Sequence, residues 1–152
     1  MNTSIFDPSS FLDASLDAPS EKRPPLPVGD YTAVVGDVTA RQWQSKDGSK
    51  SGIAWDIPLA IEIPAEVQAA TGMNANITLK DSLFLDLTDN GTINNAPGKN
   101  GRLRAYREAV DLNKAGDVFS ARKMTGKVIR VAIKHELWED NIQERIGAVT
   151  RA

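Results

Sequence analysis

The sequence predicts a mainly β fold with a single substantial helix. Several long segments alternate apolar and polar residues with the period of two that is typical of strands with one buried face. Short polar segments rich in glycine, asparagine and aspartate join most of them, as in antiparallel hairpins. Only one segment repeats its apolar residues at helical spacing, whereas a doubly wound α/β fold needs several helices between its strands.

Residues 1–26 are expected to form a flexible acidic and apolar tail, and residues 27–152 the folded domain. The tail contains four prolines and scattered acidic residues, interrupted by small apolar clusters, so it is a poor candidate for a core. A second interpretation is an acidic, apolar motif that docks on another protein. A short helix could begin near Asp7 and continue to Leu16.

The first strand is expected over residues 30–43. Gly36 lies inside it and indicates a bulge, because a glycine within a strand often marks one. Past this bulge, Arg41 and Trp43 would point outward, away from the core. Residues 44–51 form a polar turn centred on Asp-Gly, which is a hairpin signal.

The second strand, residues 51–63, carries an apolar residue at every odd position and is the strongest structural signal in the chain. Pro58 within it favours an edge or a bulge. Residues 64–75 are a connection with room for one helical turn. The third strand is expected over residues 76–87, and Asp81 interrupts its apolar face, which indicates a bulge or the rim of a barrel.

The second half of the chain supplies the helix and two more strands. The Gly- and Asn-rich residues 88–101 predict an exposed loop. The expected elements that follow are a helix over 102–112, a connection over 113–125, strands over 126–138 and 142–149, and a turn over 139–141. Five long strands with one helix between the third and fourth are the plan of a five-stranded OB-fold barrel. A β-sandwich is the nearest structural alternative.

Four short segments carry a resemblance to a known family. Residues 27–34 (PVGDYTAV) resemble the opening strand of small phage-encoded OB-fold proteins, some of which bind single-stranded DNA. Residues 101–109, 124–128 and 131–136 are similar to the helix and fourth strand of that family. The resemblance covers about residues 27–150. It implies an OB fold and binding of single-stranded DNA.

Charge and strand parity indicate where a nucleic acid would bind. The chain has a net charge of −2, yet residues 99–134 hold ten basic and three acidic residues. Such a basic segment in a mildly acidic chain points to a local anionic partner. Residues on the outward parity of the strands, on the hairpin loop and on the helix make up the predicted nucleic-acid contacts, namely Arg41, Trp43, Lys46, Lys50, Lys80, Phe84, Arg102, Arg104, Arg130, Lys134 and Trp138.

Aromatic and cationic side chains that alternate on one surface suit a single strand. Bases stack on aromatic rings regardless of sequence, and lysine and arginine neutralise the phosphates between them. Each residue alone also has an ordinary structural explanation. Phe84 or Trp138 could be covered by the helix or the tail, and Arg102 and Arg104 could simply solvate the start of a helix.

Catalytic sites have little support. The chain has no cysteine, and His135 is its only histidine, so disulfides, thiolate zinc sites and a Ser-His-Asp triad lack their residues. Gly-Lys at 126–127 is followed by valine, unlike a phosphate-binding loop. Asp81 and Asp86 have opposite strand parity and do not predict a metal site. We therefore expect a protein that is not an enzyme and that has neither a cofactor nor a metal.

Single-stranded DNA binding with weak sequence specificity, in phage replication or recombination, is the function that these observations favour. The alternative is a protein-interaction or structural module of a phage assembly that docks through its N-terminal tail. A third hypothesis is a nuclease that uses the scattered aspartates. The expected partners are single-stranded DNA, with RNA left open, replication proteins bound by residues 1–26, and a second copy of the chain through exposed strand edges. No membrane segment or secretion signal is recognisable, so the cytoplasm of a host bacterium is the expected location.

Overall fold

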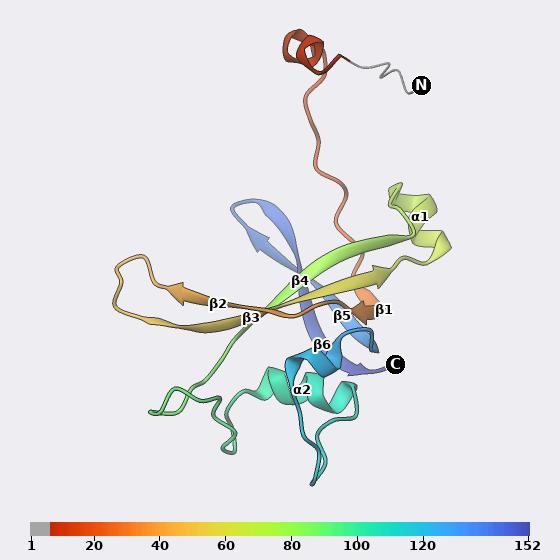
Figure 1. Ribbon diagram of the computed structural model, residues 1–152. Coiled ribbons are helices and arrows are strands. Elements are labelled where there is room, and N and C mark those ends of the chain that lie inside the picture. Colours follow the sequence, from red (N-terminus) through yellow and green to blue (C-terminus); the bar gives the residue numbers. More distant parts are fainter. Residues whose placement is uncertain (1–6) are drawn as a thin grey trace, which may run out of the picture.

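A computed structural model describes residues 7–152 and shows a mainly β protein built on one six-stranded antiparallel sheet (Figure 1). The strands are β1 (Gly29–Val35), β2 (Thr39–Gln44), β3 (Ser51–Glu62), β4 (Asn76–Phe84), β5 (Val128–Trp138) and β6 (Asn141–Arg151). The helices are α1 (Ala65–Thr71) and α2 (Gly101–Ala109), with 3₁₀ turns at Pro8–Asp13 and Ala121–Met124. The mainly β class predicted from the sequence is confirmed.

β1 and β2 follow the same edge of β3 and replace the single strand expected over residues 30–43. The break falls at Gly36, whose N–H donates to the carbonyl of Pro58 at 2.8 Å. A Cβ at Gly36 would lie 2.9 Å from Cγ of Pro58, so the close approach of this segment to β3 requires glycine. The predicted irregularity is therefore confirmed at the predicted residue, although it separates two strands rather than bending one.

The sheet is open, unlike the closed barrel that the sequence predicted. Its strand order is β2-β3-β1-β5-β6, with β4 on the other edge of β3. No backbone ladder joins β4 to β6 within residues 7–152. Side chains bridge the two strands instead, because Arg102 at the start of α2 binds the Asp81 carboxylate of β4 at 2.5 Å and the Gly147 carbonyl of β6 at 3.1 Å. An ion pair with a partly exposed Arg102 thus lies where a last ladder would close the sheet.

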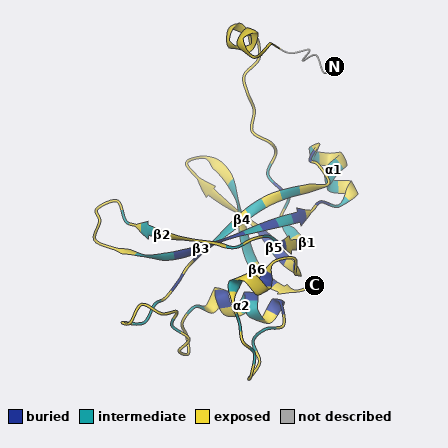
Figure 2. Cartoon of the chain, viewed as in Figure 1, coloured by how far each residue is buried: buried dark blue, intermediate teal, exposed yellow. Residues whose placement is uncertain are grey.

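The core lies between the inner face of the sheet and α2, as the burial colours of Figure 2 show. Ile57, Leu59 and Ile61 of β3 are fully buried, which confirms the strict alternation read in the sequence. Burial of such a side chain contributes roughly 1.5–3 kcal/mol. α2 buries Leu103 and Tyr106 at the predicted helical spacing. The helix ends earlier than residue 112, and Asp111 has a positive φ of 61°.

The tail is anchored to the sheet at its C-terminal end. Leu26 is fully buried in the core, and its N–H donates to Glu144 of β6 at 2.8 Å. Arg23 forms an ion pair with the same carboxylate at 2.6 Å. Residues 7–22 are exposed and extend away from the sheet (Figure 1), whereas residues 1–6 of the predicted tail lie outside the described residues. The packed part therefore begins before residue 27, the predicted boundary.

Candidate nucleic-acid interface

Arg41, Trp43 and Phe84 form a cluster on the outer face of β2, β3 and β4, which we call the aromatic shelf. The rings of Trp43 and Phe84 meet edge to face with centroids 5.7 Å apart. The guanidinium of Arg41 lies over the Phe84 ring, 5.7 Å from its centroid. The strand register explains the meeting, since Arg41 pairs with Ala54 and Ala54 pairs with Phe84 across β3. The outward parity predicted for these three residues is confirmed.

Small residues of β3 make room for the aromatic shelf. Gly52 pairs with Trp43, and a Cβ at Gly52 would lie only 2.8 Å from Nε1 of the indole. Ala54 is fully buried beneath its large neighbours. Gly52 and Ala54 were not predicted as part of the interface. Their signal was available in the strand register, because a glycine and an alanine opposite two large outward residues indicate a seat for those side chains.

Two properties of the aromatic shelf suit it to binding rather than to packing. The Phe84 ring is 59% exposed, although it belongs to a formed cluster. The indole N–H of Trp43 is buried and lacks a hydrogen-bond partner within residues 7–152. Buried polar groups are nearly always paired in native structures, so this donor is an exception that needs an explanation.

Asp56 fixes the orientation of Arg41. Its carboxylate accepts hydrogen bonds from the Ser82 hydroxyl at 2.6 Å and from Nε of Arg41 at 2.9 Å. The Ser82 hydroxyl and the Arg41 guanidinium hold the pKa of Asp56 below its usual range, although burial acts in the opposite direction. Asp56 is therefore ionised at neutral pH and holds Arg41 over the Phe84 ring. Asp56 was not predicted as a site residue, although it lies at an even, outward position of a strand whose odd residues are apolar.

A series of hollows continues from the aromatic shelf. One of about 240 Å³ lies between β4 and β6 and is lined by Lys80, Phe84 and Arg145, among others. A second of about 280 Å³, between the end of β4 and the start of α2, shares Ser82 and Phe84 with it. Phe84 thus lies where the two hollows meet. Arg145 was not among the predicted contacts because the last strand alternates weakly.

The remaining predicted contacts fall into two groups. Lys46 and Lys50 lie in the β2–β3 turn, where Asp47 accepts hydrogen bonds from two serines that lower its pKa to about 2. Lys80 of β4 is exposed on the same face as the aromatic shelf and pairs with Pro58 of β3. These cations lie on or beside the strands that build the aromatic shelf.

The other predicted cations and Trp138 lie apart from the aromatic shelf or have other partners. Arg102 binds Asp81 and so links β4 to β6, and Arg104 forms a loose ion pair with Glu108 at 3.8 Å. Arg130 donates to the Thr32 hydroxyl at 3.3 Å. The Lys134 side chain lies along Gly147 of β6, and Trp138 is 58% exposed at the end of the β5–β6 hairpin. The β2–β3 and β5–β6 hairpins both project from the sheet in Figure 1. Of the predicted contacts, the structure brings Arg41, Trp43 and Phe84 together in one compact cluster, and the role of the others stays a prediction.

The groups considered for catalysis have structural partners. Asp81 is bound by Arg102 and by the Tyr106 hydroxyl at 2.6 Å; burial raises the pKa of Tyr106, and the nearby Asp81 carboxylate raises it further. The His135 ring nitrogen Nε2 lies 2.7 Å from the carbonyl oxygen of Leu26. No group of three metal-binding side chains occurs in the part of the chain from residue 7 onward. Over the same residues, the helices are too short or too polar to cross a membrane.

No protein-family model matches the chain, and none of the curated proteins matches it in sequence. The geometry of the aromatic shelf and its hollows is therefore what supports a function.

Proposed function

We propose that this chain is a non-enzymatic single-stranded DNA-binding protein with weak sequence specificity that acts in phage DNA replication or recombination in the host cytoplasm. The observation that carries the proposal is the aromatic shelf, where an exposed Phe84 ring lies beside Trp43 and under Arg41. A base that stacks on an aromatic ring gains roughly 1–3 kcal/mol whatever its identity. Arg41 and Lys80 would neutralise the adjoining phosphates.

We also propose that the sheet is an open form of the OB fold. If β1 and β2 are counted as one interrupted strand, five strands remain, and α2 lies between the third and the fourth. Such folds bind oligonucleotides on the face of their second and third strands, between two loops. The corresponding face here is that of β3 and β4, which carries Phe84 and is flanked by the β2–β3 and β5–β6 hairpins (Figure 1).

Fluorescence of Trp43 tests the proposal directly. The chain has three tryptophans, so the double variant Trp55→Phe/Trp138→Phe leaves Trp43 as the only reporter. Oligo-thymidine should quench this fluorescence, because a stacked base contacts the shelf. With about six phosphate contacts, affinity should fall by about three orders of magnitude between roughly 50 and 200 mM salt. Duplex DNA of equal length is the control and should bind more weakly.

Two outcomes would count against this function. One is a Trp43 signal that oligo-thymidine leaves unchanged at both salt concentrations, with circular dichroism showing a folded protein. The other is equal binding of single-stranded and duplex DNA, which would indicate contact with phosphates alone.

A second candidate function is docking on a protein through the tail. Leu12 and Leu16 are each 85% exposed and lie among acidic residues, a pattern that suits a partner with an apolar, basic surface. A deletion of residues 1–22 tests this role and keeps Arg23 and Leu26, which hold the tail to the sheet. Loss of a replication or assembly partner with unchanged affinity for oligo-thymidine would favour docking. Unchanged partner binding would exclude it.

A further inference from the structure

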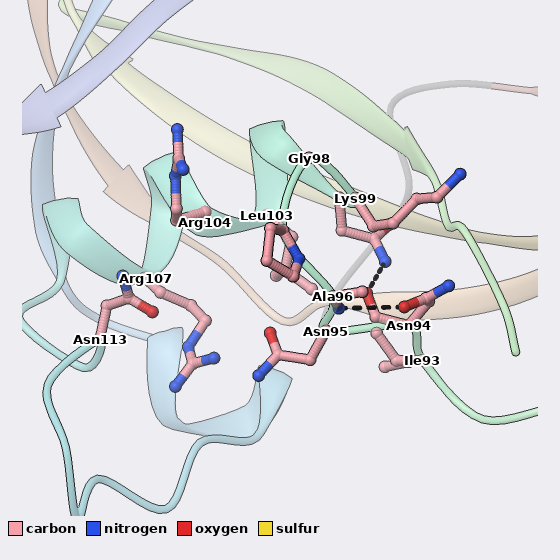
Figure 3. Close-up of a pocket in the computed structure, with 12 residues that line it drawn as sticks. Ile93, Asn94, Asn95, Ala96, Gly98, Lys99, Leu103, Arg104, Arg107 and Asn113 are labelled. Carbon is pink, nitrogen blue, oxygen red and sulfur yellow. Dashed lines mark hydrogen bonds between the residues drawn. The ribbon is translucent and has the colours of Figure 1, made fainter.

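A second pair of hollows adjoins α2, and no residue of the aromatic shelf lines either of them. The first, about 310 Å³, lies between α2 and the loop over residues 93–100 (Figure 3). The second, about 530 Å³, is bounded by Trp55 of β3 and by Phe119. Both are lined by Leu103 and Arg107 of α2. They therefore adjoin one another, and each has a size typical of a site for a small molecule.

Arg107 is held in place where the two hollows meet. Its Nε donates to the carbonyl of Leu112 at 3.0 Å, and its guanidinium lies over the Phe119 ring, 4.9 Å from the centroid. Within residues 7–152 its two terminal nitrogens make no hydrogen bond. Figure 3 shows Arg107, Asn95 and Asn113 directed toward a common space. The site thus offers a fixed planar cation together with side-chain amides that can donate and accept hydrogen bonds.

The charge of these walls favours an anion. Three lining residues are cations, namely Lys99, Arg104 and Arg107. One is an acid, Asp117, whose carboxylate accepts the N–H of Lys114 at 2.7 Å. Lys99 and Arg104 extend from the rim of the first hollow in Figure 3. A positive mouth on a chain of net charge −2 points to a specific anionic ligand.

We propose that this pair of hollows binds a nucleotide, with its base in the larger hollow and its phosphate at the mouth. Trp55 and Phe119 provide aromatic walls, and a guanidinium plane such as that of Arg107 stacks on a base. Lys99 and Arg104 are long enough to turn toward a phosphate. The nucleotide is either free or the terminal residue of a strand, which present the same chemistry. The site does not depend on the aromatic shelf, so it stands or falls separately from the proposed function.

The test uses the full chain with Trp55 as its only tryptophan, in the double variant Trp43→Phe/Trp138→Phe. Deoxyadenosine monophosphate should change the Trp55 fluorescence saturably. Deoxyadenosine without a phosphate should bind at least about tenfold more weakly, because it lacks the charge-assisted contacts. Asn95→Ala and Arg107→Lys should each weaken binding by about tenfold, the second because lysine lacks the planar fork. Arg122→Gln, which removes an exposed cation outside both hollows, should have no effect.

Two results would overturn the site. One is the absence of a saturable Trp55 signal with deoxyadenosine monophosphate while circular dichroism shows a folded protein. The other is equal affinity of the nucleotide and the nucleoside combined with normal binding by Asn95→Ala. Competition by 5′-phosphorylated and 5′-hydroxyl oligo-deoxyadenosine identifies the source. Stronger competition by the phosphorylated strand indicates a strand end, and equal or weaker competition indicates a free nucleotide.

Discussion

Replacement of Phe84 by alanine should remove most of the affinity for single-stranded DNA and leave the fold intact. The ring is 59% exposed, so its removal uncovers little of the core. Its contacts with the Trp43 ring and the Arg41 guanidinium each contribute about 1 kcal/mol or less to stability. A base stacked on the ring gains roughly 1–3 kcal/mol, so affinity should fall by about fivefold to a hundredfold.

The assay is a titration of fluorescently labelled oligo-thymidine, paired with thermal unfolding of each variant. Val128→Ala is the matched control, because Val128 is an exposed apolar residue at the start of β5, away from the aromatic shelf. Phe84→Trp should retain binding, since it keeps a stacking ring. The dependence of affinity on salt should be unchanged in Phe84→Ala, because no charge is removed. Wild-type affinity in Phe84→Ala, or an equal loss in Val128→Ala, would refute the stacking mechanism.

Four further predictions concern the structure around this face. Gly52→Ala should displace the Trp43 indole and cost about 1–3 kcal/mol in the free energy of unfolding, measured with urea, together with a loss of oligo-thymidine affinity. Leu26→Ala should cost about 2–5 kcal/mol in the same assay, because Leu26 is fully buried. Arg102→Gln should speed hydrogen exchange of β4 and β6, because it removes the bridge between them. Asp47→Asn should reduce the dependence of the free energy of unfolding on pH below about pH 4, measured by urea unfolding at several pH values. The pKa of Asp47 is about 2 in the folded chain and about 3.9 in the unfolded chain, so its stabilisation is present above about pH 4 and is lost as the pH falls toward 2.

Local periodicity was sufficient to predict the elements that carry the aromatic shelf. Side chains alternate strictly between the two faces of a strand, so the odd apolar residues of β3 placed the even ones outward. The glycine at 36 correctly marked where the parity of the first strand changes, and this placed Arg41 and Trp43 on the same side as Phe84. These inferences succeeded because each depends on backbone geometry within one strand.

Contacts between distant segments could not be predicted in this way. Arg102 was expected to bind phosphate, and only the folded chain shows that the Asp81 carboxylate of β4 occupies it. The same Arg102 side chain links β4 to β6, which no backbone ladder joins in the described part of the chain. Leu26 belonged to a proline-rich segment that looked unstructured. In the folded chain its N–H donates to the Glu144 carboxylate of β6, and its carbonyl oxygen lies 2.7 Å from Nε2 of His135. Partners so far apart in sequence leave no periodic signal.

The aromatic shelf collects features that a fold selected only for stability would avoid. The buried indole N–H of Trp43 lacks a partner, which costs roughly 1–3 kcal/mol. Gly52 gives up the side-chain packing of an ordinary strand residue so that the Trp43 indole can lie against its backbone. Phe84 exposes most of its ring to water. These features fall on neighbouring residues of one face, while Ile57, Leu59 and Ile61 on the opposite face of β3 are fully buried. A concentration of local penalties of this kind is expected where a surface is kept for a ligand.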